Sequence, residues 1–312
     1  MRYDLLKLDF GTAVHFGNGR LDTADMTFCA DRLFSALCIE AHKKGGEEYL
    51  GSIVKAAKAG DLLLSDGLPY IGDTYYIPKP VIHIERERDE SSSVMKKAFK
   101  KLSYIPVDKI NEFITGNIDP EAENKKFSEI GRFGKRYIVS VRNGEEDPLP
   151  YRVGDYRFRS GCGLYVILAC ADDDLYYDIS ELIESLGYSG IGGKISSGTG
   201  KFGVSPKKVP AALIKAFEGE YQRYISLSVC MAKPGELESV VRNAGYVMLK
   251  RSGFIYSYTY ADTFRKKNEL YCFAAGSCFE RRFEGDIFDL SEGGAHPVWR
   301  YAKPLLMGVN IS

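Results

Sequence analysis

The chain has 312 residues, 45% of them hydrophobic and 27% charged, which is the composition of a folded protein of about two domains. Its 42 basic and 42 acidic side chains give a net charge of zero, so a nucleic-acid-binding function would need basic residues gathered on one surface. A charged N-terminus, no apolar run of membrane length and seven cysteines without a C-x-x-C pair predict a reduced, cytoplasmic protein without membrane contact, metal or cofactor.

The N-terminal part predicts a strand, a polar loop and two helices. Residues 3–10 alternate around apolar positions, as a half-buried strand does. A polar segment, residues 11–22, follows and is called the first loop below. Apolar residues then recur at helical spacing over 30–42 and 47–58, and Gly60 marks the end of the second helix.

Two strands and a charged insertion come next. Residues 62–65 and 74–77 predict strands on either side of a turn at 67–72, which holds two glycines and a proline. From about 85 to 161 the sequence is highly charged and broken. We interpret this stretch as an insertion that projects from the first domain.

Within the insertion the pattern predicts two helices and a hairpin. The helices are expected at 94–102 and 107–115. The hairpin arms are expected at 137–141 and 153–158, because Asn143-Gly144 between them is a typical two-residue hairpin turn. An ordinary solvated surface hairpin is the alternative.

A continuous apolar strand at 163–170 leads to a helix with apolar residues at 179, 182, 183 and 186, followed by a glycine-rich segment and a strand over 201–205. Residues 1–210 therefore predict the order β-α-β-β-α-β, an α+β fold of the ferredoxin-like (RRM-like) type. Gly187 is predicted to end the helix.

Residues 211–312 contain mostly strand signals and predict a second, degenerate copy of the same plan. Gly285 is expected to turn a hairpin between two short apolar segments. The predicted strands are 224–231, 246–249, 254–260 and 270–275, and the hairpin pairs 279–283 with 286–290.

The segment 187–203, called the glycine loop below, is the strongest functional signal, since seven of its seventeen residues are glycine. Lys194 and Lys201 are its only charges, and Ser196 and Ser197 add hydroxyl groups. Cations, hydroxyls and bare amides suit an anionic, extended ligand such as a nucleic-acid backbone. The glycines predicted to let the ligand approach are Gly192 and Gly193.

Two other interpretations of the glycine loop have to be considered. Its segment 198–203 matches G-x-G-x-x-G, but the order helix, loop, strand excludes a dinucleotide-binding site, which needs strand, loop, helix. A flexible loop that only connects two elements is the other alternative.

Further candidate contacts lie near the first loop. Arg20 is a candidate phosphate contact or a surface salt bridge, and Arg32 is a candidate anion contact in a first helical turn or a helix-surface ion pair. His15, Phe16 and Gly17 are candidate RNA contacts, with base stacking for the phenylalanine; a hydrogen-bonded structural histidine is the alternative.

The insertion holds one more candidate group. Arg132, Lys135 and Arg136 are basic and are interleaved with the aromatic residues Phe133 and Tyr137, as contacts to single-stranded RNA would require. An ordinary amphipathic strand is the alternative.

Four segments, taken in order, resemble the RAMP subunit that caps the 5′ end of the guide RNA in type III-A CRISPR effector complexes, often called the fourth Csm subunit. They are His15-Phe-Gly-Asn-Gly-Arg-Leu-Asp22, Ala30-Asp-Arg-Leu-Phe-Ser-Ala-Leu37, Gly190-Ile-Gly-Gly-Lys-Ile-Ser-Ser-Gly-Thr-Gly-Lys-Phe-Gly203 and Pro297-Val-Trp-Arg-Tyr-Ala-Lys-Pro304. The insertion resembles the family only in its position, which is that of a thumb.

The resemblance implies two ferredoxin-like domains, with the glycine loop and the first loop holding the repeat-derived 5′ handle of the crRNA. It implies a thumb that separates handle from guide, and contacts with the large polymerase-like subunit and a backbone RAMP subunit of an antiviral ribonucleoprotein complex. It also implies that the chain is not itself an enzyme.

Two other functions stay open at this point. One is a metal-independent endoribonuclease that processes precursor crRNA, for which His15, Tyr188 and Lys194 would have to converge as base, acid and oxyanion stabiliser. The other is an assembly scaffold in which the glycine loop is only structural.

Overall fold

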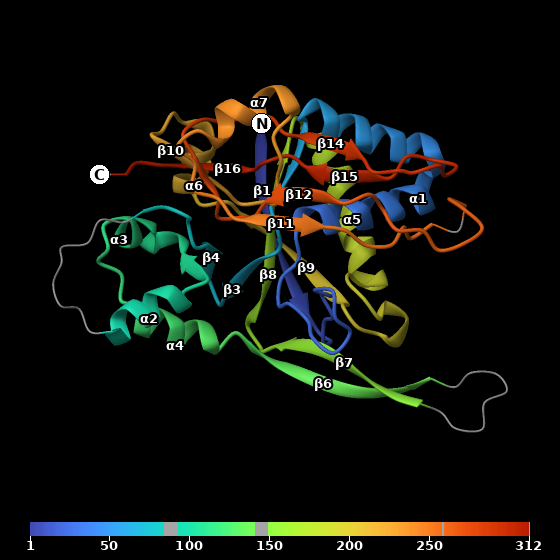
Figure 1. Cartoon of the computed structure of the whole chain (residues 1–312), viewed down its shortest axis with the longest axis horizontal. Coiled ribbons are helices and arrows are strands. Elements are labelled where there is room, and N and C mark those ends of the chain that lie inside the picture. The colour runs from blue at the N-terminus through green and yellow to red at the C-terminus, as the bar shows by residue number, and fades with distance from the viewer. Residues whose placement is uncertain (84–92, 141–148, 258, 312) are drawn as a thin grey trace.

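The computed structural model describes residues 1–83, 93–140, 149–257 and 259–311, and a seven-stranded antiparallel sheet forms its centre (Figure 1). The hydrogen-bonded order is β5-β4-β3-β8-β1-β9, and the short β2 also pairs with β8. The strands are β1 (Arg2–Phe10), β2 (Leu62–Leu64), β3 (Leu68–Ile71), β4 (Thr74–Pro78), β5 (Tyr104–Pro106), β8 (Cys162–Cys170) and β9 (Phe202–Lys208).

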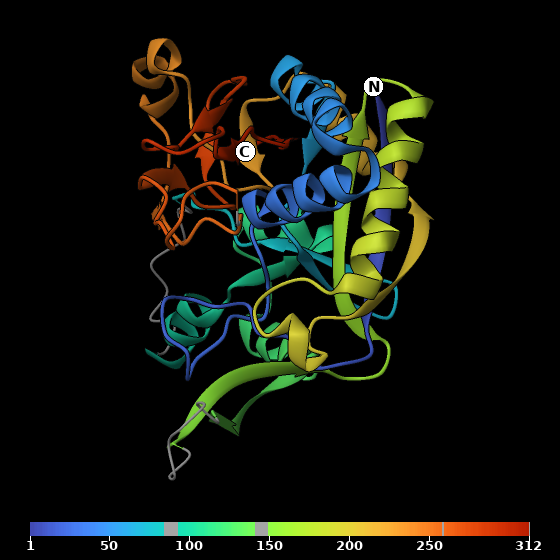
Figure 2. The ribbon, with the colours of Figure 1, turned by 90° about the vertical axis from the view of Figure 1, so that its right-hand side faces the viewer.

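Two helices, α1 (Ala30–Ala59) and α5 (Asp173–Ser189), cover one face of the sheet (Figure 2). The backbone of α1 leaves helical geometry at Gly45 and Gly46, so the element consists of two helical segments, and Gly60 follows in the left-handed conformation. The two helices predicted here, and Gly60 at their end, are confirmed.

Two local predictions are wrong. Residues 68–71 form β3 rather than a turn, and the break between β2 and β3 falls at Asp66, whose Oδ1 accepts from the amides of Ala30 and Val229. Gly187 lies inside α5, where a Cβ would come within 2.5 Å of the Phe202 carbonyl oxygen, so close helix–strand packing requires glycine there.

The chain between β4 and β8 forms a helical group and a separate two-stranded ribbon, β6 with β7 (Figure 1). The predicted helices are confirmed. Both predicted arms lie in this ribbon, but residues 137–140 pair with 149–152 rather than with 153–158, and residue 141 lies outside the described residues. The predicted turn at residues 143–144 lies outside the described residues. The pattern did not reveal α4, although Asp119 caps it and Pro120 begins it. The elements are α2 (Ser93–Lys101), a 3₁₀ turn (Val107–Lys109), α3 (Ile110–Ile114), α4 (Pro120–Ser128), β6 (Gly131–Ser140) and β7 (Leu149–Phe158).

The described residues of the C-terminal part form small antiparallel sheets, β13-β10-β16, β11-β12 and β14-β15, and the helices α6 and α7. The predicted hairpin of 279–283 with 286–290 is wrong, because β13 pairs with β10 and β14 pairs with β15. The expected strand 254–260 is replaced by a bridge between Phe254 and Lys266. The elements are α6 (Ala211–Glu218), β10 (Arg223–Ser226), α7 (Pro234–Val241), β11 (Met248–Arg251), β12 (Leu270–Phe273), β13 (Cys278–Phe279), β14 (Asp286–Asp289), β15 (Trp299–Ala302) and β16 (Leu306–Val309).

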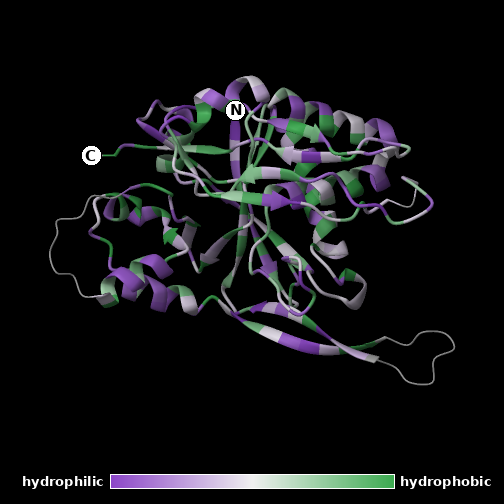
Figure 3. Ribbon diagram, viewed as in Figure 1, coloured by the Kyte–Doolittle hydropathy of each residue, from purple (hydrophilic) through white to green (hydrophobic). Residues whose placement is uncertain are grey.

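Alternate residues of β1 point to opposite faces and enter two different cores. Leu6 packs with α1 and α5, and this core also contains Tyr301 of β15. Leu5 packs on the other face with Ile225 of β10 and Met307 of β16. In Figure 3 the central strand β8 is largely hydrophobic, whereas α2 and α4 are mostly hydrophilic. Both cores thus join the N-terminal and C-terminal parts of the chain.

Among the helices of the described ranges, none combines the length and the apolar character that crossing a membrane would require.

A candidate nucleic-acid interface

Three segments that are far apart in the sequence meet at one end of the central sheet. Val14 of the first loop and Tyr156 of β7 exchange two backbone hydrogen bonds of 2.8 Å. The Gly193 amide of the glycine loop donates to the His15 carbonyl, also at 2.8 Å. The first loop therefore lies between the glycine loop and the base of the ribbon, and the three predicted groups of RNA contacts belong to one region.

The glycine loop is held along its length by hydrogen bonds. The buried Thr199 hydroxyl donates to the carbonyls of Gly193 and Lys194, at 2.9 and 2.7 Å. A 3₁₀ turn, Ile195–Ser197, closes its tip. The structure thus gives this loop one defined conformation, which a simple flexible connector would not need.

Two loop glycines are required by the close packing of the glycine loop on the first loop. A Cβ on Gly193 would lie 2.7 Å from the Cδ2 atom of His15, and one on Gly192 would lie 2.8 Å from the His15 carbonyl oxygen. Gly192 also has a φ of 104°, which disfavours other residues. These two glycines therefore allow two protein loops to dock, and their contact with RNA stays a prediction.

The candidate cations and hydroxyls of the glycine loop differ in their surroundings. Ser196, Ser197 and Lys201 are exposed. In contrast, Lys194 is half-buried in a left-handed conformation, and its Nζ lies 3.2 Å from the Tyr151 hydroxyl of β7. Lys201 is therefore available to a phosphate as it stands, whereas Lys194 ties the loop to the ribbon.

His15 and Phe16 are both buried. His15 Nδ1 lies 2.6 Å from the Gly154 carbonyl oxygen and donates to it, which fixes the ring against β7. The Phe16 ring is fully buried and packs edge-on against Phe10 and Phe28. Base stacking by Phe16 is therefore not possible in this conformation, and the expected RNA contact of its ring is corrected to a core contact.

Arg32, at the start of α1, reaches into the first loop. Its Nη2 donates to the Gly17 carbonyl oxygen at 2.9 Å, and its guanidinium lies 5.9 Å from the centre of the Phe16 ring. Burial lowers the pKa of Arg32. Arg20 is exposed on the same loop. Arg32 thus shapes the first loop from below, while Arg20 is open to solvent.

One face of the ribbon carries exposed aromatic residues beside cations. Phe133 and Tyr137 are each 64% exposed, and they share a face with Lys135 because residues alternate along a strand. The Arg152 guanidinium lies 5.1 Å from the Tyr137 ring centre on the neighbouring strand. An aromatic ring and a cation in this arrangement can stack on a base and contact its phosphate.

The three basic residues predicted at the ribbon base do not act alike. Lys135 forms an ion pair of 3.5 Å with Asp22 of the first loop. Arg136 points to the opposite face and lies 3.5 Å from Asp155. Arg132 is exposed beside Arg157 of β7. Arg132 and Lys135 can thus reach a ligand, whereas Arg136 is turned away from them and its buried Nε and Nη2 atoms have no hydrogen-bond partner among the described residues.

The three residues of the endoribonuclease hypothesis are not brought together by any contact. His15 is buried and hydrogen-bonded to β7, Tyr188 is exposed near the end of α5, and Lys194 bonds to Tyr151. Within the described ranges, no group of three or more His, Cys, Asp or Glu side chains could hold a metal ion.

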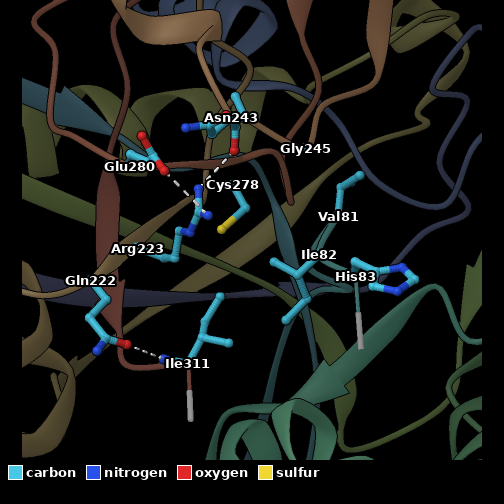
Figure 4. A pocket seen from close by; sticks show the side chains of 11 residues that line it. Val81, Ile82, His83, Gln222, Arg223, Asn243, Gly245, Cys278, Glu280 and Ile311 are labelled. Carbon is cyan, nitrogen blue, oxygen red and sulfur yellow. Dashed lines mark hydrogen bonds and ion pairs between the residues drawn. The ribbon is translucent and has the colours of Figure 1, made fainter. Parts of the chain in front are cut away.

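A hollow of about 850 Å³ lies elsewhere, between β10, β13 and residues 81–83 (Figure 4). Arg223 in its wall donates to the Asn243 carbonyl at 2.7 Å and lies 3.4 Å from Glu280. Its charged groups are therefore paired with one another, and it contributes nothing to the interface described above.

Comparison with known proteins places the whole chain beside one set of relatives. A family model for the C-terminal domain of CRISPR Csm4 matches residues 219–309. A CRISPR system Cms protein Csm4 from Mycobacterium tuberculosis is 36% identical over 309 residues, which cover 99% of this chain and 98% of the relative. The protein of the same name from Streptococcus thermophilus is 32% identical over 319 residues, with all of both chains covered.

Solved structures of low sequence identity share the fold. A Csm3–Csm4 subcomplex of a type III-A CRISPR-Cas interference complex contains a chain that matches with a TM-score of 0.68 and 17% identity, over 98% of this chain and 99% of that one. A Csm1–Csm4 cassette in complex with cA4 contains a chain that matches with a TM-score of 0.63 and 18% identity, over 100% and 99%.

Proposed function

The chain belongs to the Csm4 family of CRISPR system proteins, and we propose that it is a non-catalytic RNA-binding subunit that anchors the 5′ handle of the crRNA in a type III-A effector complex. The observation that carries the proposal is the meeting of the first loop, the glycine loop and the ribbon base in one region. Exposed Lys201, Ser196 and Ser197 supply groups that bind a phosphate backbone.

The proposal includes a ferredoxin-like first domain, residues 1–210. The antiparallel order β9-β1-β8-β2 with α1 and α5 on one face supports it, because this is the strand order of a β-α-β-β-α-β unit. It also includes a degenerate second domain, residues 211–312, and a thumb-like role for the β6–β7 ribbon, which would separate the handle from the guide.

We propose protein partners of two kinds, a Csm1-type large subunit and a Csm3-type backbone subunit. The two solved complexes described above contain such partners together with a Csm4 chain, which supports their assignment here. A cytoplasmic ribonucleoprotein complex of antiviral defence is the setting that these partners imply.

The proposal includes no catalytic role for this chain. A metal-free ribonuclease would need a base, an acid and an oxyanion stabiliser around one phosphate. His15 instead uses its Nδ1 to hold β7, and its ring is buried beneath the loops. We therefore assign His15 a positioning role for the two loops.

The test is co-expression of the chain with its native neighbouring subunits, followed by sequencing of the RNA that co-purifies. We expect short RNAs that share one 5′ end. A Lys201→Ala/Ser196→Ala/Ser197→Ala variant should assemble but retain less RNA, and Lys207→Ala, an exposed lysine farther along β9, is the matched control.

Cleavage is tested with the same preparation in the presence of a chelator. The proposal expects labelled precursor RNA to remain intact with wild-type protein and with His15→Ala. Chelator-resistant cleavage that His15→Ala abolishes would establish the endoribonuclease instead. Complexes that form normally without RNA would establish the scaffold.

A further inference from the structure

A second aromatic and basic surface lies on the C-terminal part, in residues 252–257 and 259–268 between β11 and β12. Phe264 is 81% exposed and Phe254 is 62% exposed. Arg265 and Lys266 are exposed beside them. Exposing large apolar rings to water is unfavourable, so two such rings on one surface indicate an interaction site.

Hydrogen bonds fix the backbone on either side of Phe254 and Lys266. The Ile255 amide donates to the Arg265 carbonyl and the Lys267 amide donates to the Gly253 carbonyl, both at 2.9 Å. Phe254 therefore faces Lys266 across a short antiparallel pairing, and the Lys266 Nζ lies 5.7 Å from the ring centre of Phe254. The rings and the cations are displayed on an ordered platform.

The charges on this surface favour an anionic ligand. Among the described residues, Arg265 forms no ion pair, and Phe264 has no ring contact. Asp262 is the one acidic residue in the sequence 252–268, whereas Arg265 and Lys266 are two exposed cations close to it in the sequence. Aromatic faces for stacking and cations for phosphates are the two elements of single-strand recognition.

Contacts connect this surface with the proposed handle site. Arg251, directly before the segment, donates to Asp31 at 2.8 Å, and the next residue along α1, Arg32, donates to the Gly17 carbonyl of the first loop. The Ser252 carbonyl accepts from Arg300 in the same cluster. In Figures 1 and 2 the segment, in orange, and the β6–β7 ribbon extend from the same side of the molecule.

We propose that Phe254, Phe264, Arg265 and Lys266 form a second contact surface for single-stranded RNA, which continues the path of the strand beyond the first loop and the start of α1. The inference rests on the proposed RNA-binding function and extends it to the C-terminal part of the chain. The rings would stack on successive bases without selecting their sequence, and the two cations would contact the phosphates between them.

The experiment uses the full chain in its complex and fluorescently labelled single-stranded RNAs of increasing length. Phe264→Ala should weaken binding of the longer RNAs about five- to tenfold and leave binding of the shortest RNA unchanged. Arg265→Ala/Lys266→Ala should reduce the salt dependence of binding by about one to two phosphate contacts. Tyr177→Ala removes another exposed ring near the start of α5, 64% exposed against 81% for Phe264, and should leave RNA binding unchanged.

Crosslinking of wild-type protein to RNA with a photoreactive base gives an independent readout, since it requires no variant to fold. Crosslinked peptides should include residues 259–266. Variants of Phe264 and Arg265 that bind all RNAs normally, while Lys201→Ala binds weakly, would overturn this inference and leave the proposed function standing.

Two other outcomes are distinguishable. Loss of a partner subunit from Phe264→Ala complexes, with RNA affinity unchanged, would make the surface a protein interface and overturn the inference. Failure of every form of the complex to bind RNA would overturn the proposed function together with it.

Discussion

Arg300 of β15 donates from its guanidinium to the buried carboxylate of Asp31 in α1. Arg251 of β11 donates to the same carboxylate at 2.8 and 3.0 Å. Burial alone would raise the pKa of Asp31, but the two guanidinium groups hold it below its ordinary value. This charge cluster joins the first helix to the C-terminal part beside the proposed RNA path.

Asp31→Asn should destabilise the protein by about 3–5 kcal/mol, because it removes the carboxylate that Arg251 and Arg300 share as their counter-charge. The midpoint of urea-induced unfolding measures the effect. Asp73→Asn breaks an ion pair with Lys7 at a highly exposed carboxylate and should leave the midpoint unchanged. Equal effects of the two substitutions would contradict the role assigned to the buried cluster.

Asp66→Asn should change how stability depends on pH. Burial raises the pKa of Asp66 from 3.8 to about 7, while the unfolded chain ionises near the ordinary value. The folded state thus binds more protons between these values, so this group's contribution to stability is full below about pH 4 and is lost as the pH rises through 7.

Relative to wild type, Asp66→Asn should therefore gain stability between pH 4 and 8, since its amide cannot ionise and keeps an oxygen acceptor for the amides of Ala30 and Val229. Unfolding free energies measured across this range for both proteins test it. A difference that does not vary with pH would show that Asp66 ionises normally in the folded protein.

Lys201→Ala should weaken RNA binding and lower the salt dependence by about one phosphate contact, because its ammonium is exposed. Lys194→Ala should act differently, since Lys194 bonds to Tyr151 and its loss frees the glycine loop from β7. Binding titrations at several salt concentrations separate the two. Lys207→Ala is the control, and a drop as large as that of Lys201→Ala would indicate non-specific attraction.

Gly193→Ala should displace the glycine loop from the first loop and thereby weaken RNA binding, although the substitution changes no charge. Its Cβ would meet the His15 ring at 2.7 Å, and that ring is held by Gly154. Gly203→Ala, with no neighbouring atom within 4 Å of its Cβ, is the matched control and should bind like wild type. Binding assays and proteolysis of the loop provide the measurements. Normal RNA binding by Gly193→Ala would mean that binding does not depend on the contact between the glycine loop and His15.

Local signals in the sequence were sufficient where an element depends on its own residues. The strand predicted at 163–170, the two helical stretches of α1 and the terminating Gly60 are confirmed, because period and capping are local properties. The starts of α6 and α7 carry a local helix signal as well, a proline at or just before the first helical position. These two helices were not predicted, because strand signals dominate this half of the sequence.

Pairing over long distances was beyond the pattern. Residues 279–283 and 286–290 look like two arms of one hairpin, yet β13 pairs with β10 and β14 pairs with β15. The partner of a short strand depends on how its side chains pack in the whole fold. The segments that it packs against lie far away in the sequence, outside any local window.

By itself, the sequence determined the type of ligand to expect, since glycines, lysines and serines in one loop suit an anion, and it determined the family through four ordered motifs. Only the tertiary structure decided which of those residues face solvent. It buried Phe16 and His15, assigned Gly192 and Gly193 to the contact with the first loop, and left Lys201 free. Burial is set by what packs against a residue, and those neighbours come from β7 and α1, which lie far away in the chain.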